Sequence, residues 1–410
     1  MELYNHQQKG KNNILKVIKK NNICFLNGET RSGKTLTVLS VANKLGCGKV
    51  LFVTKKKAIS SIKKDYNLGK FTYKLTVINY ESIHKVKDND FDLVIYDESH
   101  SLSAFPKPSK RTKLIKEKFY NIPCIWMTGT AAPESYSQFY HQFWVSKFSP
   151  FKKYSNFYRW ADKFVNKEIK YLGTHRITDY SNAKVDEIDK IIKPLMVVMK
   201  KPKEDYSDIN FNKISVDVPE KIKKLADRLI KERAVEGKKG VLMADTPVKL
   251  QSKLHQVYNG SCIIDTYDEK QETIILSDYK ANFIKEYFKG KKIAIFYYFK
   301  AELDILNNVF GENITTDLNE FNNTRKNIAL QQRTAEGMNI SKADALIYYS
   351  LGFSGKDYLQ SIDRLTIKGR KSNNVYFVLE KGGMTEKILK VVQSKENYNL
   401  KTFKKDYGIK

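Results

Sequence analysis

Short apolar runs alternate with longer amphipathic stretches over the first 130 residues of the chain. The apolar runs are 23–26 (ICFL), 50–53 (VLFV), 75–79 (LTVIN), 92–97 (DLVIYD) and 124–128 (CIWMT). Continuous apolar runs of this length are typical of strands buried on both faces, and the stretches between them are typical of helices. The pattern therefore predicts an α/β domain built on a parallel sheet.

A second pattern of the same kind begins near residue 278. Its apolar runs are 292–299 (KIAIFYYF), 313–316 (NITT), 327–332 (NIALQQ), 345–350 (ALIYYS) and 374–380 (NVYFVLE). Between the two patterns the strand signal fades, and aromatic and basic residues mix. We predict an α/β fold with two parallel-sheet domains and a basic, mostly helical connector. The predicted ranges are 1–200 with a helical extension from about 146, 201–270 for the connector, and 271–410.

Size and composition agree with two domains. A chain of 410 residues exceeds what one hydrophobic core usually holds, and 41% hydrophobic residues exclude wholesale disorder. The mean hydropathy is −0.51, and no apolar run approaches the roughly 18 residues of a membrane span. The N-terminus, MELYNHQQKGKNN, has no apolar signal core. We expect a cytoplasmic protein without a membrane partner, in the host cytoplasm if the source is viral.

The four cysteines indicate neither a zinc site nor a disulfide framework, because they form no CxxC pair.

The net charge is more informative about the binding partner. Lysine and arginine number 73 against 45 acidic residues, which gives a net charge of +28. Bias toward AT-rich codons would raise lysine, but it would raise acidic residues too. A field of this sign attracts polyanions, so the charge predicts a nucleic-acid partner.

A phosphate-binding loop is the clearest chemical motif. Residues 28–35 fit the pattern GxxxxGK[ST], follow a predicted strand and precede an amphipathic run. In such a loop backbone N–H groups surround the phosphates, Lys34 reaches the outer phosphates, and the Thr35 hydroxyl binds Mg²⁺. The predicted nucleotide-binding residues are Gly28, Glu29, Thr30, Arg31, Ser32, Gly33, Lys34 and Thr35. The motif predicts binding of ATP or GTP.

Two adjacent acids end the predicted strand at 92–97. Asp97 would hold Mg²⁺, and Glu98 would polarise the attacking water. Nucleotide hydrolysis requires both tasks beside the γ-phosphate, and the end of a strand in the same sheet supplies that location. His100 follows, and it either senses the γ-phosphate or packs in the core.

These motifs resemble those of superfamily 2 helicases, and within them the Swi/Snf-like translocases and helicase-like ATPases of phages. Residues 3–7 (LYNHQ) are similar to an element whose glutamine reads adenine, so Gln7 favours ATP over GTP. Residues 77–81 (VINYE) look like a strand-binding segment, 97–100 (DESH) like the DEAH-type box, and 128–130 (TGT) like the motif that couples hydrolysis to strand contacts. The resemblance covers nearly the whole chain and implies two RecA-like domains with ATP and Mg²⁺.

The second domain resembles the family less closely. Residues 331–340 are similar to "AGGxGLNL", with Gly337 near the ribose and Asn339 near nucleic acid. Residues 360–370 resemble "QxxDRxxRxGQ", whose arginines reach the γ-phosphate across the cleft, so Arg364 and Arg370 are predicted catalytic residues. Ile367 stands where the family has its second arginine, which leaves Arg364, Arg370 or a displaced Lys368 as the finger.

Nucleic-acid contacts are expected from basic residues after strands and from the coupling motifs. The predicted contacts are Lys55, Lys56, Tyr80, Thr128, Thr130, Arg333 and Asn339. Basic residues are also interleaved with aromatics from Lys147 to Lys170, where the aromatics either stack on bases or, as we expect for Trp160, belong to the core.

The leading hypothesis is an ATP-dependent DNA helicase or translocase. DNA is favoured over RNA because the second-domain motifs are closer to the Swi/Snf side than to the DEAD-box side. Two alternatives stay open: a DNA-stimulated remodelling ATPase that does not separate strands, and a slow nucleotide-switched DNA-binding clamp, suggested by Ile367. The charge and the second domain disfavour a small-molecule P-loop kinase. Replication or recombination proteins are conceivable partners.

Overall fold

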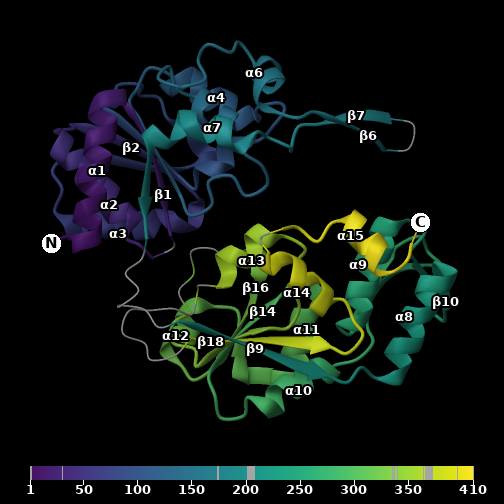
Figure 1. Ribbon diagram of the computed structural model, residues 1–410. Coiled ribbons are helices and arrows are strands. Elements are labelled where there is room, and N and C mark those ends of the chain that lie inside the picture. Colours follow the sequence, from purple (N-terminus) through teal and green to yellow (C-terminus); the bar gives the residue numbers. More distant parts are fainter. Residues whose placement is uncertain are drawn as a thin grey trace. The chain divides into compact units, whose positions relative to one another are not determined.

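The structure is a computed structural model that describes residues 2–29, 31–172, 175–200, 208–334, 338, 340–362, 364, 373–394 and 396–409 (Figure 1). The chain divides into two compact units, Met1–Pro202 (unit 1) and Lys203–Lys410 (unit 2). Each unit is built around one large parallel sheet. No helix in the described ranges is both long and apolar enough to span a membrane.

Unit 1 contains a six-stranded sheet with the order β3-β2-β4-β5-β1-β8, and every neighbouring pair is parallel. Its strands are β1 (Ile23–Gly28), β2 (Lys49–Thr54), β3 (Lys74–Asn79), β4 (Leu93–Asp97), β5 (Cys124–Thr128) and β8 (Met196–Met199). The first five coincide with the predicted apolar runs. β8 comes from a short run, MVVM, that the sequence pattern did not single out.

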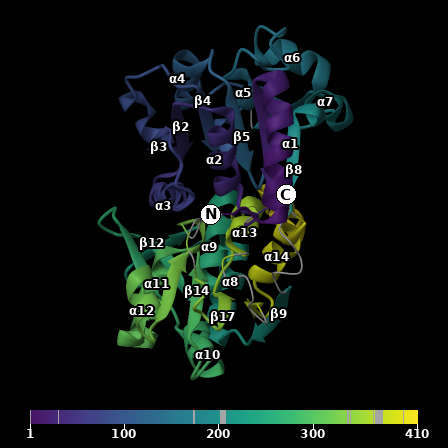
Figure 2. The ribbon, with the colours of Figure 1, turned by 90° about the vertical axis from the view of Figure 1, so that its left-hand side faces the viewer.

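Helices cover both faces of this sheet. One face packs on α1 (Asn5–Asn21), α2 (Lys34–Leu45) and α3 (Ile59–Gly69), and Figure 2 shows α1 running beside β8. The other face packs on α4 (Lys110–Phe119), α5 (Gln138–Trp144), α6 (Phe157–Phe164) and α7 (Val185–Ile192). Because successive side chains of a strand point to opposite faces, β1 buries Cys24 in the first core and Phe25 in the second. Burial on both faces explains the continuous apolar runs.

A two-stranded antiparallel arm leaves unit 1 after α6. It consists of β6 (Glu168–Leu172) and β7 (His175–Asp179), and Figure 1 shows it extending away from the helices α4, α6 and α7. Trp160, which precedes the arm, is 0% exposed, so its predicted place in the core is confirmed.

Unit 2 contains the second six-stranded sheet, again parallel throughout, with the order β15-β16-β14-β17-β18-β9. Its strands are β9 (Ile209–Val216), β14 (Ile293–Tyr297), β15 (Ile314–Thr315), β16 (Asn327–Gln331), β17 (Ala345–Tyr348) and β18 (Asn373–Glu380). One face packs on α10 (Tyr279–Tyr287) and α11 (Lys300–Phe310). The other packs on the remaining helices, which include α13 (Gly355–Ile362), α14 (Thr385–Gln393) and α15 (Leu400–Asp406). A short helix, α12 (Leu318–Asn323), lies between β15 and β16.

Two parallel six-stranded sheets confirm the predicted α/β fold with two parallel-sheet domains. The described part of 201–270 differs from a mostly helical connector. It holds β9 and the helices α8 (Glu220–Glu232) and α9 (Pro247–Tyr258), together with most of a four-stranded antiparallel sheet. That sheet consists of β10 (Ala234–Gly237), β11 (Gly240–Met243), β12 (Ser261–Thr266) and β13 (Gln271–Ile275). Its strands are short or alternate between buried and more exposed positions, as β10, β11 and β13 show, so they lack the long apolar runs that marked the buried strands.

Candidate nucleotide-binding site

The carboxyl ends of four strands of unit 1 meet at one edge of the sheet. In the strand register Asn27 lies beside Thr128, Asp97 beside Met127, and Val53 beside Tyr96. The phosphate loop, the TGT segment, the two acids and Thr54 therefore leave the sheet at the same edge. In open parallel sheets ligands bind outside this edge, where the strand order reverses.

The phosphate loop turns sharply between β1 and α2. Gly33 has φ +75°, a conformation that favours glycine, and a Cβ atom there would lie 1.9 Å from Gln7 Nε2, so the Gln7 side chain would have to move. Gln7 is 5% exposed, and its Oε1 accepts the backbone N–H of Tyr4 at 2.9 Å. The structure thus places Gln7 against the phosphate loop, while its predicted contact with adenine stays a prediction.

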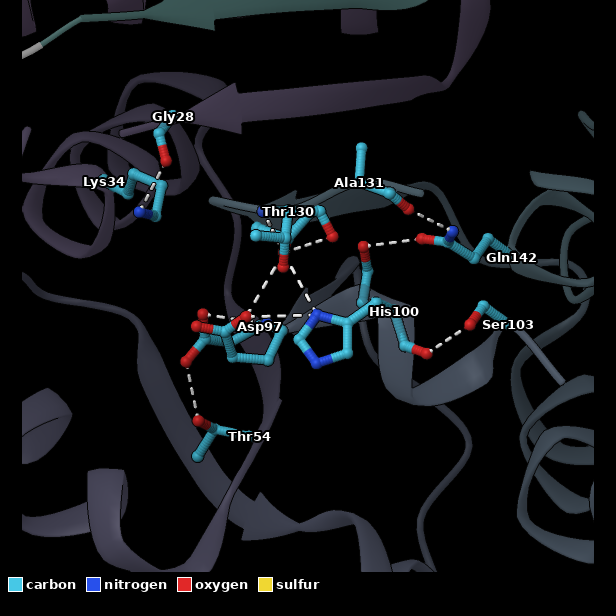
Figure 3. Close-up of polar contacts among 12 residues, drawn as sticks. Gly28, Lys34, Thr54, Asp97, His100, Ser103, Thr130, Ala131 and Gln142 are labelled. Atoms are coloured by element: carbon cyan, nitrogen blue, oxygen red, sulfur yellow. Dashed lines mark hydrogen bonds and ion pairs between the residues drawn. The ribbon is translucent and has the colours of Figure 1, made fainter. Parts of the chain in front are cut away.

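Lys34 begins α2 and folds back over the loop. Its Nζ donates to the Gly28 carbonyl oxygen at 2.8 Å (Figure 3) and to that of Glu29 at 3.0 Å. The cation is therefore held at the end of β1, beside the N-terminus of a 12-residue helix whose positive end favours a phosphate.

Other features of the loop also fit a bound anion. Within the described residues the hydroxyl of Ser32, which is 0% exposed, has no hydrogen-bond partner. A ring nitrogen of His6 lies 3.1 Å from the Ser32 carbonyl oxygen and supports the loop from outside. Arg31 takes a left-handed conformation, φ +62°, as a tight loop requires. Thr35, in the first turn of α2, is half-buried, and Thr30 lies outside the described residues.

Asp97 is fixed on both sides at the end of β4. One carboxylate oxygen accepts the Thr54 hydroxyl at 2.7 Å, and the other accepts the Glu98 N–H at 3.0 Å. The Tyr80 hydroxyl donates to the Asp97 backbone carbonyl at 2.7 Å. Tyr80 is 1% exposed, and burial raises its pKa far above the usual range, so the phenol stays a neutral donor.

Glu98 lies at the centre of a polar cluster. Its Oε2 accepts the Thr128 hydroxyl at 3.2 Å and lies 3.3 Å from His100 Nδ1, which is itself 3.2 Å from that hydroxyl (Figure 3 draws this network). The Thr128 oxygen in turn accepts the Thr130 N–H at 3.0 Å. The acid of the DESH segment and the TGT segment are therefore joined by direct hydrogen bonds.

A second set of contacts braces this cluster from α5. Gln142 accepts the Ser99 hydroxyl at 2.9 Å and donates to the Ala131 carbonyl at 2.7 Å, and Figure 3 shows it on the far side of His100. Neither Gln142 nor the role of Thr54 was predicted from the sequence. No local pattern marks Gln142, because its partners lie on distant segments and only the fold brings them together.

The donors available at this edge suit Mg²⁺ bound together with a nucleotide. Mg²⁺ usually uses one or two carboxylates or hydroxyls plus substrate phosphates, and Thr35 and Asp97 are of this kind. Across the described ranges no group of three or more His, Cys, Asp or Glu side chains forms a metal cluster of its own. These residues would hold the ion only with the phosphates in place.

The predicted nucleic-acid contacts do not share one environment. Lys56, at the start of the 3₁₀ turn Lys56–Ala58, and Arg333 are exposed. Lys55 and Thr130 are half-buried, and Tyr80 and Thr128 are buried in the network described above. Arg364 is half-buried just after α13. Gly337, Asn339 and Arg370 lie outside the described residues.

Comparisons with known proteins show the fold. No protein-family profile matches the sequence, and no curated protein matches it. The SWI2/SNF2 ATPase core domain of Sulfolobus solfataricus matches with 16% identity and a TM-score of 0.41, covering 96% of this chain and 90% of that one. The helicase domain of Pyrococcus furiosus Hef matches with 14% identity and a TM-score of 0.47, covering 92% and 96%.

The third match is the ATP-dependent Type ISP restriction-modification enzyme LlaBIII bound to DNA, with 14% identity and a TM-score of 0.51. It covers 93% of this chain but 28% of the larger enzyme. This score shows a shared fold. The chain thus shares its fold, over most of its length, with part of that enzyme.

Proposed function

We propose that the protein hydrolyses ATP at this edge of unit 1 and uses the reaction to move on DNA or to unwind it. The observation that carries the proposal is the Glu98 cluster. A carboxylate held by Thr128 and His100 follows directly after an anchored Asp97, at the same sheet edge as the phosphate loop. Phosphoryl transfer to water needs these parts within one site.

Each residue has a separate task in this mechanism. Lys34 and the loop N–H groups would bind the phosphates, and Thr35 and Asp97 would hold Mg²⁺, which would offset the charge on the phosphate oxygens. Glu98 accepts a proton from the attacking water. Thr128 positions Glu98, because its hydroxyl bonds both the carboxylate and the TGT backbone. A displacement of residues 128–130 would therefore move the Glu98 carboxylate.

Support for DNA as the track comes from charge and resemblance. The net charge of +28 favours a phosphate backbone, and the exposed Lys56 and Arg333 suit such contacts. DNA is favoured over RNA by the Swi/Snf-like motifs of the second domain. Arg364 is the candidate finger for the γ-phosphate, on the strength of the family motif alone.

The test of hydrolysis is the steady-state ATPase rate of wild type, Lys34→Ala and Lys44→Ala, each alone and with single-stranded DNA, double-stranded DNA and RNA. Lys44 is an exposed lysine in the last turn of the same helix and serves as the control. We expect DNA to stimulate the wild type and Lys44→Ala, and Lys34→Ala to lose about 10²–10³-fold in rate. Wild-type turnover in Lys34→Ala would exclude the phosphate-loop assignment.

Glu98→Gln separates binding from chemistry. The amide keeps an oxygen for Thr128 but cannot take a proton, so we expect ATP affinity to persist while the rate falls about 10²–10⁴-fold. Glu117→Gln, an exposed position on α4, is the control.

Forked and blunt duplexes then distinguish unwinding from remodelling without strand separation. Turnover near zero in the wild type, with intact ATP affinity, would favour the clamp.

A further inference from the structure

The β6–β7 arm of unit 1 carries exposed apolar side chains on both faces. Ile169 is 49% exposed and Ile177 is 44% exposed. In the antiparallel register Lys170 lies opposite Ile177 and Ile169 lies opposite Thr178, so the two isoleucines point to opposite faces. A two-stranded hairpin is marginally stable by itself, and its exposed apolar residues therefore call for an explanation.

An open groove of about 530 Å³ lies beside the arm. Its lining consists of Lys170 and residues 177–180 from the arm and its end, together with Phe105 and Pro106. The aromatic side chains are fixed, because Phe105 stacks on Phe157 at 6.0 Å and Tyr180 meets the same ring edge-on at 5.4 Å. Ile169 does not line this groove.

The chemistry of the groove matches an unpaired nucleobase. Apolar and aromatic walls offer stacking surfaces, and Lys170, which forms an ion pair with Asp179, places a cation at the side. From 147 to 184 the chain has nine lysines and arginines against three acidic residues, so the surrounding segment suits the phosphates that flank such a base. Isoleucine and proline are side chains that proteins insert between bases.

The groove is connected to the Glu98 cluster through a short stretch of chain. Ser103 donates to the His100 carbonyl at 2.6 Å, and the Ala104 carbonyl lies 2.6 Å from a ring nitrogen of His141. The next two residues are Phe105 and Pro106, the groove wall. A base in the groove therefore touches a segment continuous with the DESH motif.

We propose that this groove binds an unpaired base of a nucleic-acid strand, with Ile177 as the residue that closes over it. The inference rests on the proposed function and deepens it, since it names the single-stranded part of the substrate as what the arm engages. The opposite face of the arm, with Ile169, makes no such contact.

The test compares Ile177→Ser with Ile169→Ser, a matched control that is equally exposed on the same hairpin. Affinity is measured without ATP, by fluorescence anisotropy, for a single strand, for the same strand with abasic sites, for a blunt duplex, and for a single-stranded RNA. We expect Ile177→Ser to bind the intact strand about tenfold more weakly than wild type. Ile169→Ser should bind like wild type, and on the abasic strand the two variants should be equal.

Several results would overturn the inference. The first is that both variants bind the intact strand with the same affinity, whether that of wild type or a reduced one. The others are a loss of affinity in Ile177→Ser that persists on the abasic strand, and a loss that is as large on the blunt duplex. The measurement with single-stranded RNA tells whether the groove binds RNA as well as DNA. Circular dichroism at each temperature used excludes unfolding of the variants. Because ATP is absent, the measured affinities do not depend on hydrolysis. The ATPase proposal is tested separately, by the ATPase rate of Lys34→Ala.

Discussion

At the scale of single residues, Glu98, the proposed base, has a strained backbone conformation. Its φ of +47° lies in the left-handed region, which costs a residue other than glycine roughly 1–3 kcal/mol. The conformation turns the chain from β4 into the following 3₁₀ turn and brings the carboxylate to Thr128 and His100. Strain of this kind persists where the surrounding structure enforces it, as the Asp97 and Tyr80 contacts do here.

Glu302 in unit 2 gives a prediction about pH. It is 0% exposed, and its Oε2 accepts the N–H groups of Tyr298 and Phe299 and the Ser350 hydroxyl. In the described residues its Oε1 has no hydrogen-bond partner. Burial raises the pKa of this carboxyl from 4.5 to about 7. Between pH 4.5 and about 7, the carboxyl is therefore protonated in the folded state and ionised in the unfolded chain.

We expect this stabilising contribution to be complete below about pH 4.5 and to be lost as pH rises through 7. Glu302→Gln has no proton to lose, so wild type should lose about 3 kcal/mol of unfolding free energy relative to the variant between pH 4.5 and 8. The comparison is between variants because burial lowers the pKa of His141 and His255 to about 4, which removes stability toward acid in both proteins.

Urea unfolding followed by far-UV circular dichroism measures this difference. The three tryptophans, Trp126, Trp144 and Trp160, all belong to unit 1. Tryptophan fluorescence therefore follows unit 1 and serves as an internal control, which Glu302→Gln should leave unchanged. A difference between the two proteins that does not vary with pH would contradict the assignment.

At this scale the sequence predicted the motif residues of the candidate site but not the residues that support them. Lys34 and Asp97 belong to motifs whose spacing reflects local geometry, a strand followed by a turn, so they could be read directly. Tyr80 was expected on the nucleic-acid side, and the structure places it in the core beneath Asp97. Aromatic residues suit both places, and only packing distinguishes them.

At the scale of elements, a buried ion pair joins α10 to β18. Lys280 Nζ lies 3.0 Å from Glu380 Oε2, both side chains are 0% exposed, and Asn259 accepts a second bond from Lys280 at 2.8 Å. Thr385 donates to the other Glu380 oxygen at 2.7 Å. Burial opposes ionisation of Glu380, but Lys280 and His255 outweigh it and keep its pKa below the usual value.

Lys280→Met should destabilise unit 2 by about 3–5 kcal/mol, because it leaves a buried carboxylate without its cation. Lys381→Met is the control, since the adjacent Lys381 pairs with Asp217 in solvent and its loss should leave the transition unchanged. Far-UV circular dichroism, which reports both units, is compared with tryptophan fluorescence, which reports unit 1 and should stay unchanged. Adding Glu380→Leu should restore much of the loss, and a double variant no better than the single one would contradict the ion-pair explanation.

Strands buried on both faces gave the clearest signal in the sequence, and several of the more exposed elements gave none. β2 and β17 are continuous apolar runs because helices cover both sides. β9 has a mixed pattern, since it lies at the edge of its sheet and exposes residues such as Phe211. The arm formed by β6 and β7 is polar enough to resemble a loop, and its strand pairing is the part that sequence patterns did not show.

At the scale of the whole molecule, the net charge of +28 predicts how binding depends on salt. Each phosphate neutralised on a single strand contributes about −0.7 to the slope of log affinity against log salt, and about −0.9 on a duplex. We expect a steep negative slope for wild type, measured by anisotropy between 50 and 200 mM salt as a rough range. A slope near zero would contradict binding through the backbone.

The strand β8, which lies far along the chain from the phosphate loop, supplies a backbone partner at the entrance of that loop. The Glu29 N–H donates to the Met199 carbonyl at 2.9 Å, and Gly28 lies beside Met199 in the sheet register. Because synthesis runs from the N-terminus, the phosphate loop is made early and Met199 much later. A nascent chain interrupted before residue 196 would thus contain the whole loop motif without the backbone partner that holds its entrance.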